Sequence, residues 1–179
     1  KKKINDEFLM YLDYKNNHFI LGAAQFGDAY GISNKKNKLT RKNIISILNF
    51  ARGKISEIDS AEDYNIENEI KKNFKNFIVN NKIDISFFKK PFSEIESYFK
   101  KINNKNKVNI LFVRNLENDF KNIKKLNKIL KLKRLNYINK IGISIYSYKY
   151  IKKLYKTIKY DVIQAPLNIL DNRSDNYEI

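Results

Sequence analysis

Hydrophobic positions in this chain alternate between short runs typical of strands and longer stretches with helical spacing. The short runs predict six strands, at residues 19–23, 55–59, 77–82, 108–113, 139–144 and 161–166. Between them, apolar residues recur every three or four positions and so share one face of a helix. The pattern therefore predicts strands and amphipathic helices in strict alternation.

Two of the five predicted helices also carry start signals. Thr40 is a suitable N-cap for the first helix, and Pro91 can open the third. The apolar stripes, in chain order, are Ile44, Ile47, Leu48 and Ala51; Ile66, Ile70 and Phe74; Phe92, Ile95, Phe99 and Ile102; Phe120, Ile123, Leu126 and Leu130; and Tyr148, Ile151, Leu154, Tyr155 and Ile158.

Strands joined by helices pair in parallel, with the helices packed outside the sheet. A doubly wound open sheet and a (β/α)8 barrel both fit. The open sheet usually has a G-x-G-x-x-G loop after its first strand, and the spacing of Gly22, Gly27 and Gly31 does not match it. We therefore predict an α/β fold, an incomplete parallel (β/α) TIM-type barrel of about six of the eight units. Residues 1–179 are expected to form one domain, with 1–18 as a polar lead-in.

The composition excludes several classes of protein. The formal net charge of +17 is typical of nucleic-acid or membrane-surface binding. However, Lys, Asn and Ile all have AT-rich codons, and the lysines are spread along the chain, so we expect neither nucleic acid nor membrane as a partner. A basic nucleic-acid-binding domain stays as the less favoured alternative. The chain has no cysteine and no apolar run of about 20 residues, so we expect a cytoplasmic protein. The single histidine, His18, lacks partners at metal-ligand spacing, so we expect no metal site.

Polar residues stand at the C-terminal ends of five predicted strands. They are Asp59, Lys82, Arg114, Ser144 and Gln164. In a parallel barrel these ends open on one face, called the mouth here, where barrel enzymes build their active sites. The five side chains are therefore expected to converge.

Carbonyl reduction is a chemistry that suits Asp59, Lys82 and Tyr64, the last of which stands on the loop just beyond the second strand. A tyrosine phenol has a pKa near about 10, too high for efficient proton transfer at neutral pH. The ammonium of Lys82 would lower that pKa, and Asp59 would hold the lysine in place. The alternative is a structural ion pair beside a packing tyrosine.

Four segments of the chain resemble the bacterial aldo/keto reductases. They are 21–32 (LGAAQFGDAYGI), 59–64 (DSAEDY), 141–144 (IGIS) and 163–173 (IQAPLNILDNR). The second resembles the D-[TS]-A-x-x-Y box that holds the family's catalytic aspartate and tyrosine. The resemblance runs in order from about residue 19 to 173.

This resemblance implies an NADP(H)-dependent oxidoreductase that acts on a small aldehyde or ketone. Tyr64 would be the proton donor. Ser144 and Gln164 would hold the nicotinamide carboxamide, and the backbone near Gly22 and Ala23 would line the cofactor's path. The oligomeric state is not predicted.

The chain departs from the family's pattern in three places. Arg114 stands where the family usually has His, and a guanidinium is larger and permanently charged. Asn65 replaces a glycine, a mild change because Asn tolerates the left-handed conformation. The last two units of the barrel are absent, so the chain resembles a fragment and is expected to lack activity by itself. A degenerate, non-catalytic relative is therefore the main alternative function.

Overall fold

The computed structural model describes residues 19–27, 39–62, 64, 76–103, 107–119, 122–168 and 170. Its elements are β1 (Ile20–Gly22), α2 (Ala24–Gly27), α3 (Arg41–Ala51), β2 (Glu57–Ala61), β3 (Ile78–Asp84), η1 (Ile85–Lys89), α5 (Phe92–Ile102), β4 (Val108–Arg114), η2 (Leu116–Asn118), α6 (Ile123–Arg134), β5 (Ile138–Ser144), η3 (Tyr148–Tyr150), α7 (Ile151–Thr157) and β6 (Val162–Gln164). The predicted lead-in 1–18 and the predicted helix around 66–74 lie outside the described residues.

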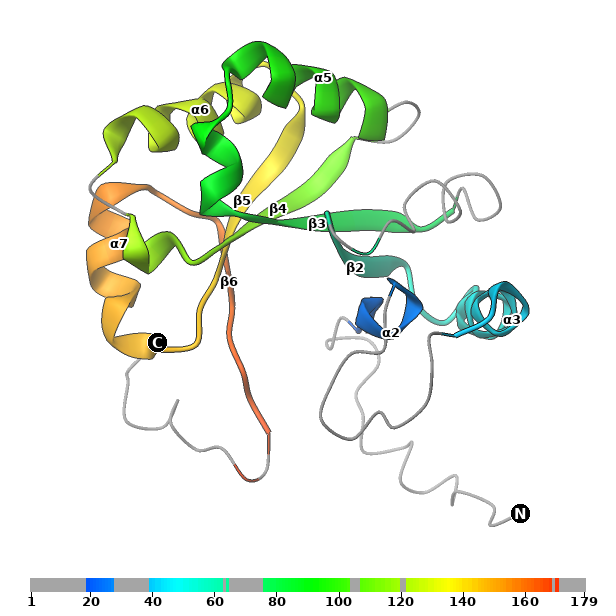
Figure 1. Ribbon diagram of the computed structural model, residues 1–179. Coiled ribbons are helices and arrows are strands. Elements are labelled where there is room, and N and C mark those ends of the chain that lie inside the picture. The colour runs from blue at the N-terminus through cyan, green and yellow to red at the C-terminus, as the bar shows by residue number, and fades with distance from the viewer. Residues whose placement is uncertain are drawn as a thin grey trace.

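The strands form one parallel sheet in the order β1-β2-β3-β4-β5-β6. Each strand lies beside the next one in the sequence, whereas a doubly wound sheet reverses its order at a switch point. The sheet curls, and α5, α6 and α7 cover its convex side (Figure 1). The prediction of an incomplete TIM-type barrel is confirmed, and the open-sheet alternative is wrong.

The main hydrophobic core lies between the sheet and these helices. Side chains alternate along a strand, so one set from β3, β4 and β5 faces the helices. Fully buried Leu111 and Val113 meet Phe99 of α5 and Ile129 of α6 in this layer. A second cluster joins β2 to α3, where Thr40 caps the helix by accepting a hydrogen bond from the Asn43 backbone at 3.2 Å. The helices therefore fix which strand face points outward.

Inside the curl, the space below the mouth is filled by side chains. Ile110 and Phe112 alternate with the outward residues of β4, and they are only 6% and 3% exposed. A Cβ atom on Gly142 of β5 would lie 2.4 Å from the Phe112 ring. Gly142 therefore gives the Phe112 ring its place in the interior.

Three strands end two residues away from their predicted ends. The strand predicted at 55–59 forms at Glu57–Ala61. It begins later because the chain first completes the turn around Gly53 (φ +79°), and it ends later because Ala61 still pairs with Lys82. The third strand continues to Asp84. The sixth stops at Gln164, two residues before Pro166, which has no N–H to donate to a ladder.

Two helix predictions can also be compared with the structure. The third helix begins directly after Pro91, as predicted. In the fifth, Tyr148 begins the 3₁₀ turn η3, and the α-helix starts only at Ile151. No helix in the described part of the chain is long and apolar enough to cross a membrane.

Candidate functional site

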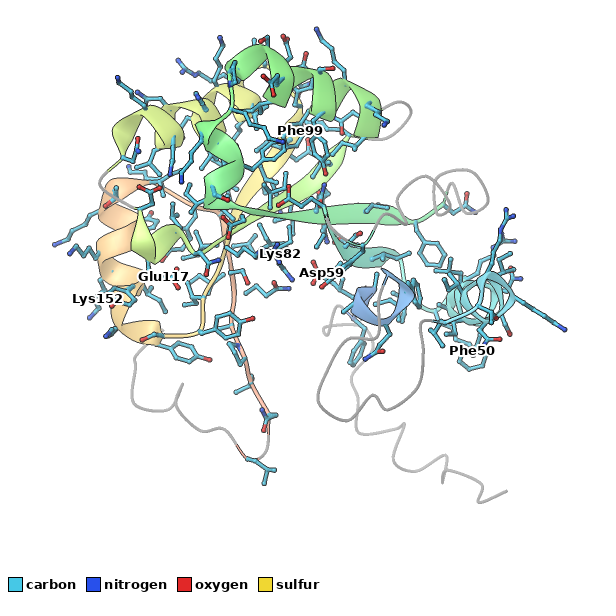
Figure 2. The ribbon with its side chains drawn as sticks, viewed as in Figure 1. Phe50, Asp59, Lys82, Phe99, Glu117 and Lys152 are labelled. Atoms are coloured by element: carbon cyan, nitrogen blue, oxygen red, sulfur yellow. The ribbon has the colours of Figure 1, made fainter. Side chains whose placement is uncertain are left out.

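The centre of the site is a charged pair inside the curled sheet. Lys82 Nζ lies 3.0 Å from Asp59 Oδ2, and the two side chains are 16% and 19% exposed. Gln164 donates through Nε2 to the same Asp59 oxygen at 3.0 Å. Figure 2 shows Asp59 and Lys82 on the inner side of the sheet. Since β2 and β6 are not neighbours in the sheet, the Gln164 contact requires its curvature.

A row of paired residues extends this inner surface around the mouth. Asp84 pairs with Arg114, Arg114 with Ser144, and Ser144 with Gln164. Residues paired across parallel strands point to the same face, and Gln164 points inward to Asp59. The whole row therefore lines the inside of the sheet at the strand ends. The structure brings the five strand-end residues of the sequence prediction to one surface.

Asp59 and Lys82 are nevertheless placed deeper than predicted. Each stands two residues before the end of its strand, because β2 continues to Ala61 and β3 to Asp84. This depth removes the pair partly from water. Among the described residues, Asp59 Oδ1 is buried without a hydrogen-bond partner. The pair is therefore more enclosed than a surface ion pair.

Tyr64 lies in the turn that follows β2. Its backbone N–H donates to the Ala61 carbonyl at 3.0 Å, which closes the turn. A Cβ on Gly27 would come within 2.6 Å of the Tyr64 Cα, so the end of α2 packs directly against this turn. The tyrosine is partly buried against the cluster that joins β2 and α3. Gly27, noted in the sequence only for its spacing, is thus a close-approach position that holds Tyr64.

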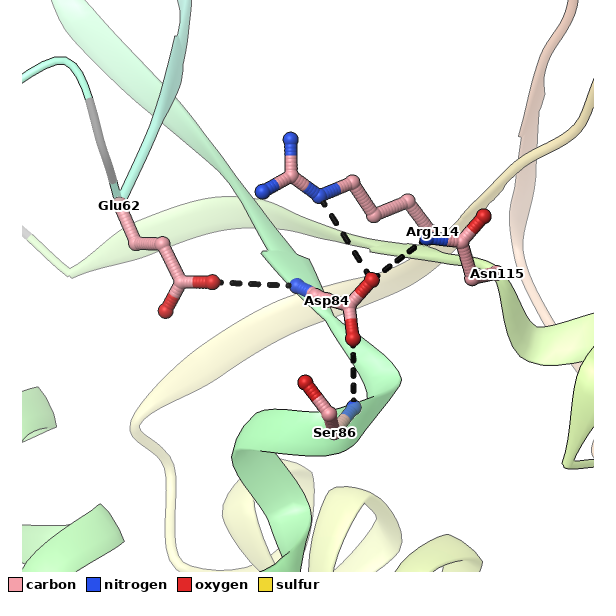
Figure 3. Close-up of polar contacts among 5 residues, drawn as sticks. All are labelled: Glu62, Asp84, Ser86, Arg114 and Asn115. Atoms are coloured by element: carbon pink, nitrogen blue, oxygen red, sulfur yellow. Dashed lines mark hydrogen bonds and ion pairs between the residues drawn. The ribbon is translucent and has the colours of Figure 1, made fainter.

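Asp84 connects the ends of β3 and β4 (Figure 3). Its Oδ1 accepts from the Ser86 backbone at 2.8 Å, and its Oδ2 accepts from Asn115 Nδ2 at 2.6 Å. Arg114 Nε lies 3.9 Å from the same Oδ2. The Asp84 backbone N–H donates to Glu62 Oε1 at 3.3 Å. Glu62, which follows β2, is partly buried and contacts β3 through this hydrogen bond.

The environment of Asp84 favours its ionised form. Burial raises the pKa of the carboxyl group, but three contributions outweigh it: the hydrogen bonds from Ser86, the hydrogen bond from Asn115, and the charge of Arg114. The pKa is therefore held below its ordinary value of 3.8. Near neutral pH this position carries a full negative charge next to Arg114.

This lowered pKa predicts a pH-dependent contribution to stability. A carboxyl group with a lowered folded-state pKa stabilises the fold above its unfolded pKa and loses that effect as the pH falls through the folded value. We expect Asp84→Asn to lower the unfolding free energy at pH 7, and the gap to wild type to narrow below about pH 4. Urea unfolding of both proteins from pH 7 to pH 2 measures the gap. Taking the difference cancels other carboxyl groups, such as Asp161, whose pKa is also lowered. A gap that does not change with pH would contradict the prediction.

The predicted cofactor-binding residues lie at the same end of the sheet. Gly22 pairs with Asp59 at the end of β1, and a Cβ there would meet nothing within 4 Å, so its backbone borders open space. Ala23 follows and donates to the Asp59 carbonyl at 2.9 Å. Ser144 and Gln164 are paired neighbours. No group of three His, Cys, Asp or Glu side chains among the described residues could hold a metal ion.

Sequence reasoning missed Asp84 and Asn115. Asp84 stands two residues after Lys82, so strand alternation alone puts both on the same face. A third strand drawn two residues longer would have included it. Asn115 has φ 58° and ψ 22°, a left-handed conformation that Asn tolerates, and no sequence pattern marked it.

The fold and the site together define a class of protein. It is a parallel (β/α) barrel, here incomplete, whose inner surface carries an aspartate–lysine pair close to the C-terminal ends of the strands. Solved structures similar to this chain are aldo-keto reductases. A thermostable one, Tm1743 in complex with the inhibitor epalrestat, matches with a TM-score of 0.63 and 16% identity over 88% of this chain and 61% of its own. The holo form of AKR11C1 from Bacillus halodurans matches with a TM-score of 0.65 and 15% identity over 89% and 56%.

A third, AKR2E5 of the silkworm Bombyx mori, matches with a TM-score of 0.64 and 14% identity over 87% of this chain and 53% of its own. No protein-family model and no curated protein matches the sequence. The chain thus spans 61% of the first of these reductases. It has the fold of the aldo-keto reductases, as the motifs predicted.

Proposed function

We propose that this chain is part of an oxidoreductase of the aldo-keto reductase type that transfers hydride between NADP(H) and a small aldehyde or ketone. The observation that carries the proposal is the contact of Lys82 and Gln164 with one carboxylate, Asp59. It fixes an ammonium on the inner surface of the curled sheet, two residues before the end of β3. Tyr64 stands in the turn just beyond β2, the strand that carries Asp59.

In the proposed reaction, the side chains of the mouth manage a proton. The phenol of Tyr64 donates its proton to the carbonyl oxygen while the carbonyl carbon is reduced. A neighbouring positive charge stabilises the phenolate left behind, and Lys82 supplies that charge. Asp59 keeps the ammonium in one position, because a 3.0 Å ion pair restricts an otherwise flexible lysine.

The residues at the strand ends suit a nicotinamide cofactor. Gln164 uses Nε2 for Asp59, which leaves its amide oxygen as the acceptor for a carboxamide N–H. The hydroxyl of Ser144, on the next strand, can donate to the carboxamide oxygen. The open space beside Gly22 allows a ligand to approach the backbone closely. When bound, the nicotinamide ring supplies or accepts the hydride.

A phenylalanine at position 64 tests the proton donor. We expect Tyr64→Phe to lower kcat for aldehyde reduction by about 10²- to 10⁴-fold, because the phenol is the general acid. NADPH affinity should stay nearly unchanged. The rate is followed as NADPH oxidation by the intact gene product, and NADPH binding by fluorescence titration.

Tyr155→Phe is the matched control for this variant. Tyr155 lies on α7 and is 49% exposed, and phenylalanine keeps its edge contact with Tyr160. It should retain wild-type turnover. If Tyr64→Phe also keeps wild-type turnover, Tyr64 is not the proton donor.

A non-catalytic relative is the second candidate, and Arg114 favours it. A second cation at the mouth favours the phenolate of a nearby tyrosine, and a phenolate has no proton to donate. The two candidates differ in one outcome. NADPH binding without turnover of any carbonyl compound would support the non-catalytic relative.

A further inference from the structure

Residues 120–160 carry most of the excess positive charge of the chain. They hold 13 of its 36 Lys and Arg residues and none of its 19 Asp and Glu residues, so they account for +13 of the formal net charge of +17. The lysines are spread along the chain, but the acidic residues that would balance them are missing from this segment. The excess charge is therefore local, which supports the nucleic-acid alternative for the elements that this segment forms.

The lysines of α6 are largely engaged with the rest of the fold. Lys125 is buried and pairs with Asp119, and Lys133 pairs with Asp161 at 2.7 Å. Lys128 donates to two backbone carbonyl oxygens at 3.0 and 2.6 Å. These contacts fasten α6 to its neighbours, so its positive charges are in large part used within the protein.

The lysines along α7 are placed differently. Lys152 and Lys156 stand four positions apart, so they share one face of the helix, while Lys149 precedes α7 and Lys159 follows it. All four are exposed, and none forms an ion pair with an acidic side chain in the described part of the chain. Figure 2 shows Lys152 on the outer side of α7. The outer face of α7 is thus a row of positive charges without acidic partners among those residues.

An exposed aromatic ring stands in the same row. Tyr155 lies three positions after Lys152 and directly before Lys156, and it is 49% exposed. Its ring meets that of Tyr160 edge-on, with the centroids 5.3 Å apart and an interplanar angle of 78°. The Tyr160 hydroxyl donates to the Ile151 carbonyl at 3.2 Å, which anchors the second ring to α7. Tyr155 is therefore held by a fixed neighbour while about half of its surface faces solvent.

The opposite face of α7 is occupied by the main hydrophobic core. Leu154 is fully buried, Ile158 is 2% exposed, and Ile151 packs against the same cluster. A helix that lies in a membrane surface inserts its apolar face into the lipid. Because α7 already uses that face against the sheet, it can offer a partner only its charged and aromatic face. This arrangement favours nucleic acid over a membrane.

Lysines and an exposed tyrosine match the two chemical parts of single-stranded nucleic acid. Ammonium groups bind the phosphates and release the counterions around them. A tyrosine ring stacks on an unpaired base, and this contact tolerates any base because every base has a π-face. In a duplex the bases are already stacked on one another, so the exposed ring favours a single strand.

We propose that the outer face of α7 binds single-stranded nucleic acid, with Lys149, Lys152, Lys156 and Lys159 on the phosphates and Tyr155 stacked on a base. This surface lies on the convex side of the sheet, away from the Asp59–Lys82 pair. The inference therefore goes beyond the proposed function and does not depend on it.

The first test concerns the charges. Fluorescence anisotropy measures binding of labelled oligothymidylate and oligouridylate, of equal length, to the intact gene product at several salt concentrations. Each lysine on a phosphate adds about 0.7 to the steepness of log K against log salt concentration. Lys152→Gln should reduce that slope by about 0.7 and weaken binding by about 2- to 5-fold. The two oligonucleotides show whether DNA or RNA is preferred, and binding of either supports the proposal.

Lys42→Gln is the matched control for the loss of one positive charge. Lys42 is exposed on α3, which packs against β2 in the second hydrophobic cluster, whereas α7 belongs to the main core. This variant should leave the salt slope and the affinity unchanged. Equal losses in Lys42→Gln and Lys152→Gln would overturn the assignment of the site to α7.

The second test concerns the aromatic ring. Tyr155→Ala should weaken binding by about 5- to 100-fold without a change in the salt slope, because it removes base stacking. Tyr155→Phe keeps the ring and should bind as the wild type does. An abasic oligonucleotide of the same length keeps the phosphates, and it should bind equally to the wild type and to Tyr155→Ala. Circular dichroism spectra like that of the wild type would show that the variants are folded.

The remaining outcomes separate the possible partners. No binding of either oligonucleotide, or binding that is the same in Tyr155→Ala and in the wild type, would overturn the proposal. Sedimentation with vesicles of phosphatidylcholine and phosphatidylserine, without oligonucleotide binding, would overturn it in favour of a membrane surface. Oligonucleotide binding that depends on Lys152 and Tyr155 would support it even if no carbonyl compound is reduced.

Discussion

Truncation of Phe99 to alanine is expected to lower the free energy of unfolding by about 4 kcal/mol. Phe99 is fully buried on the inner face of α5, where its ring meets Tyr98 edge-on at 5.4 Å and an interplanar angle of 85°. The cavity left by the ring would lie between α5 and the sheet, in the main core. Equilibrium unfolding in urea or guanidinium chloride measures the change.

Phe50→Ala is the matched control, since it deletes the same ring at the surface. Phe50 is 74% exposed at the end of α3 (Figure 2). Its ring contacts the Lys54 ammonium at 3.6 Å, a cation–π contact that contributes about 0.5–1 kcal/mol at an exposed site. A loss at Phe99 no larger than the loss at Phe50 would mean that the layer between helices and sheet is not a packed core.

Gly142→Ala is expected to lower the free energy of unfolding by about 2 kcal/mol, because it overpacks the barrel interior. The added methyl group would lie 2.4 and 2.7 Å from two atoms of the Phe112 ring, which is buried in the interior and only 3% exposed. Phe112→Leu in the Gly142→Ala background should recover part of the loss. Denaturant unfolding of the single and double variants measures both effects.

Gly22→Ala provides the comparison at another strand position. A Cβ at Gly22 meets nothing within 4 Å, so this variant should be neutral or gain about 0.4–1 kcal/mol from the reduced entropy of the unfolded chain. Similar effects at Gly22 and Gly142 would show that the interior is not filled in the way described.

The sequence alone determined the succession of units and the surface on which the chemistry stands. Alternation and helical spacing are local properties, so they appear in the pattern of apolar residues. Parallel pairing followed from the helices between strands, because a short turn cannot return a chain to the same end of a sheet. The positions of Asp59, Lys82 and Gln164 near the ends of three strands were therefore enough to predict one shared surface.

The tertiary structure decided which of these side chains touch. The hydrogen bond from Gln164 to Asp59 joins residues 105 positions apart, across β3, β4 and β5, and it exists only because the sheet curls. Strand ends were also set by pairing: β3 continues to Asp84, two residues beyond the predicted strand 77–82, because Arg114 of β4 lies beside it. Curvature and register depend on neighbours that are distant in the chain. For this reason the sequence predicted a mouth lined by polar residues, while the contacts of Asp84 with Arg114 and Asn115 emerged only from the structure.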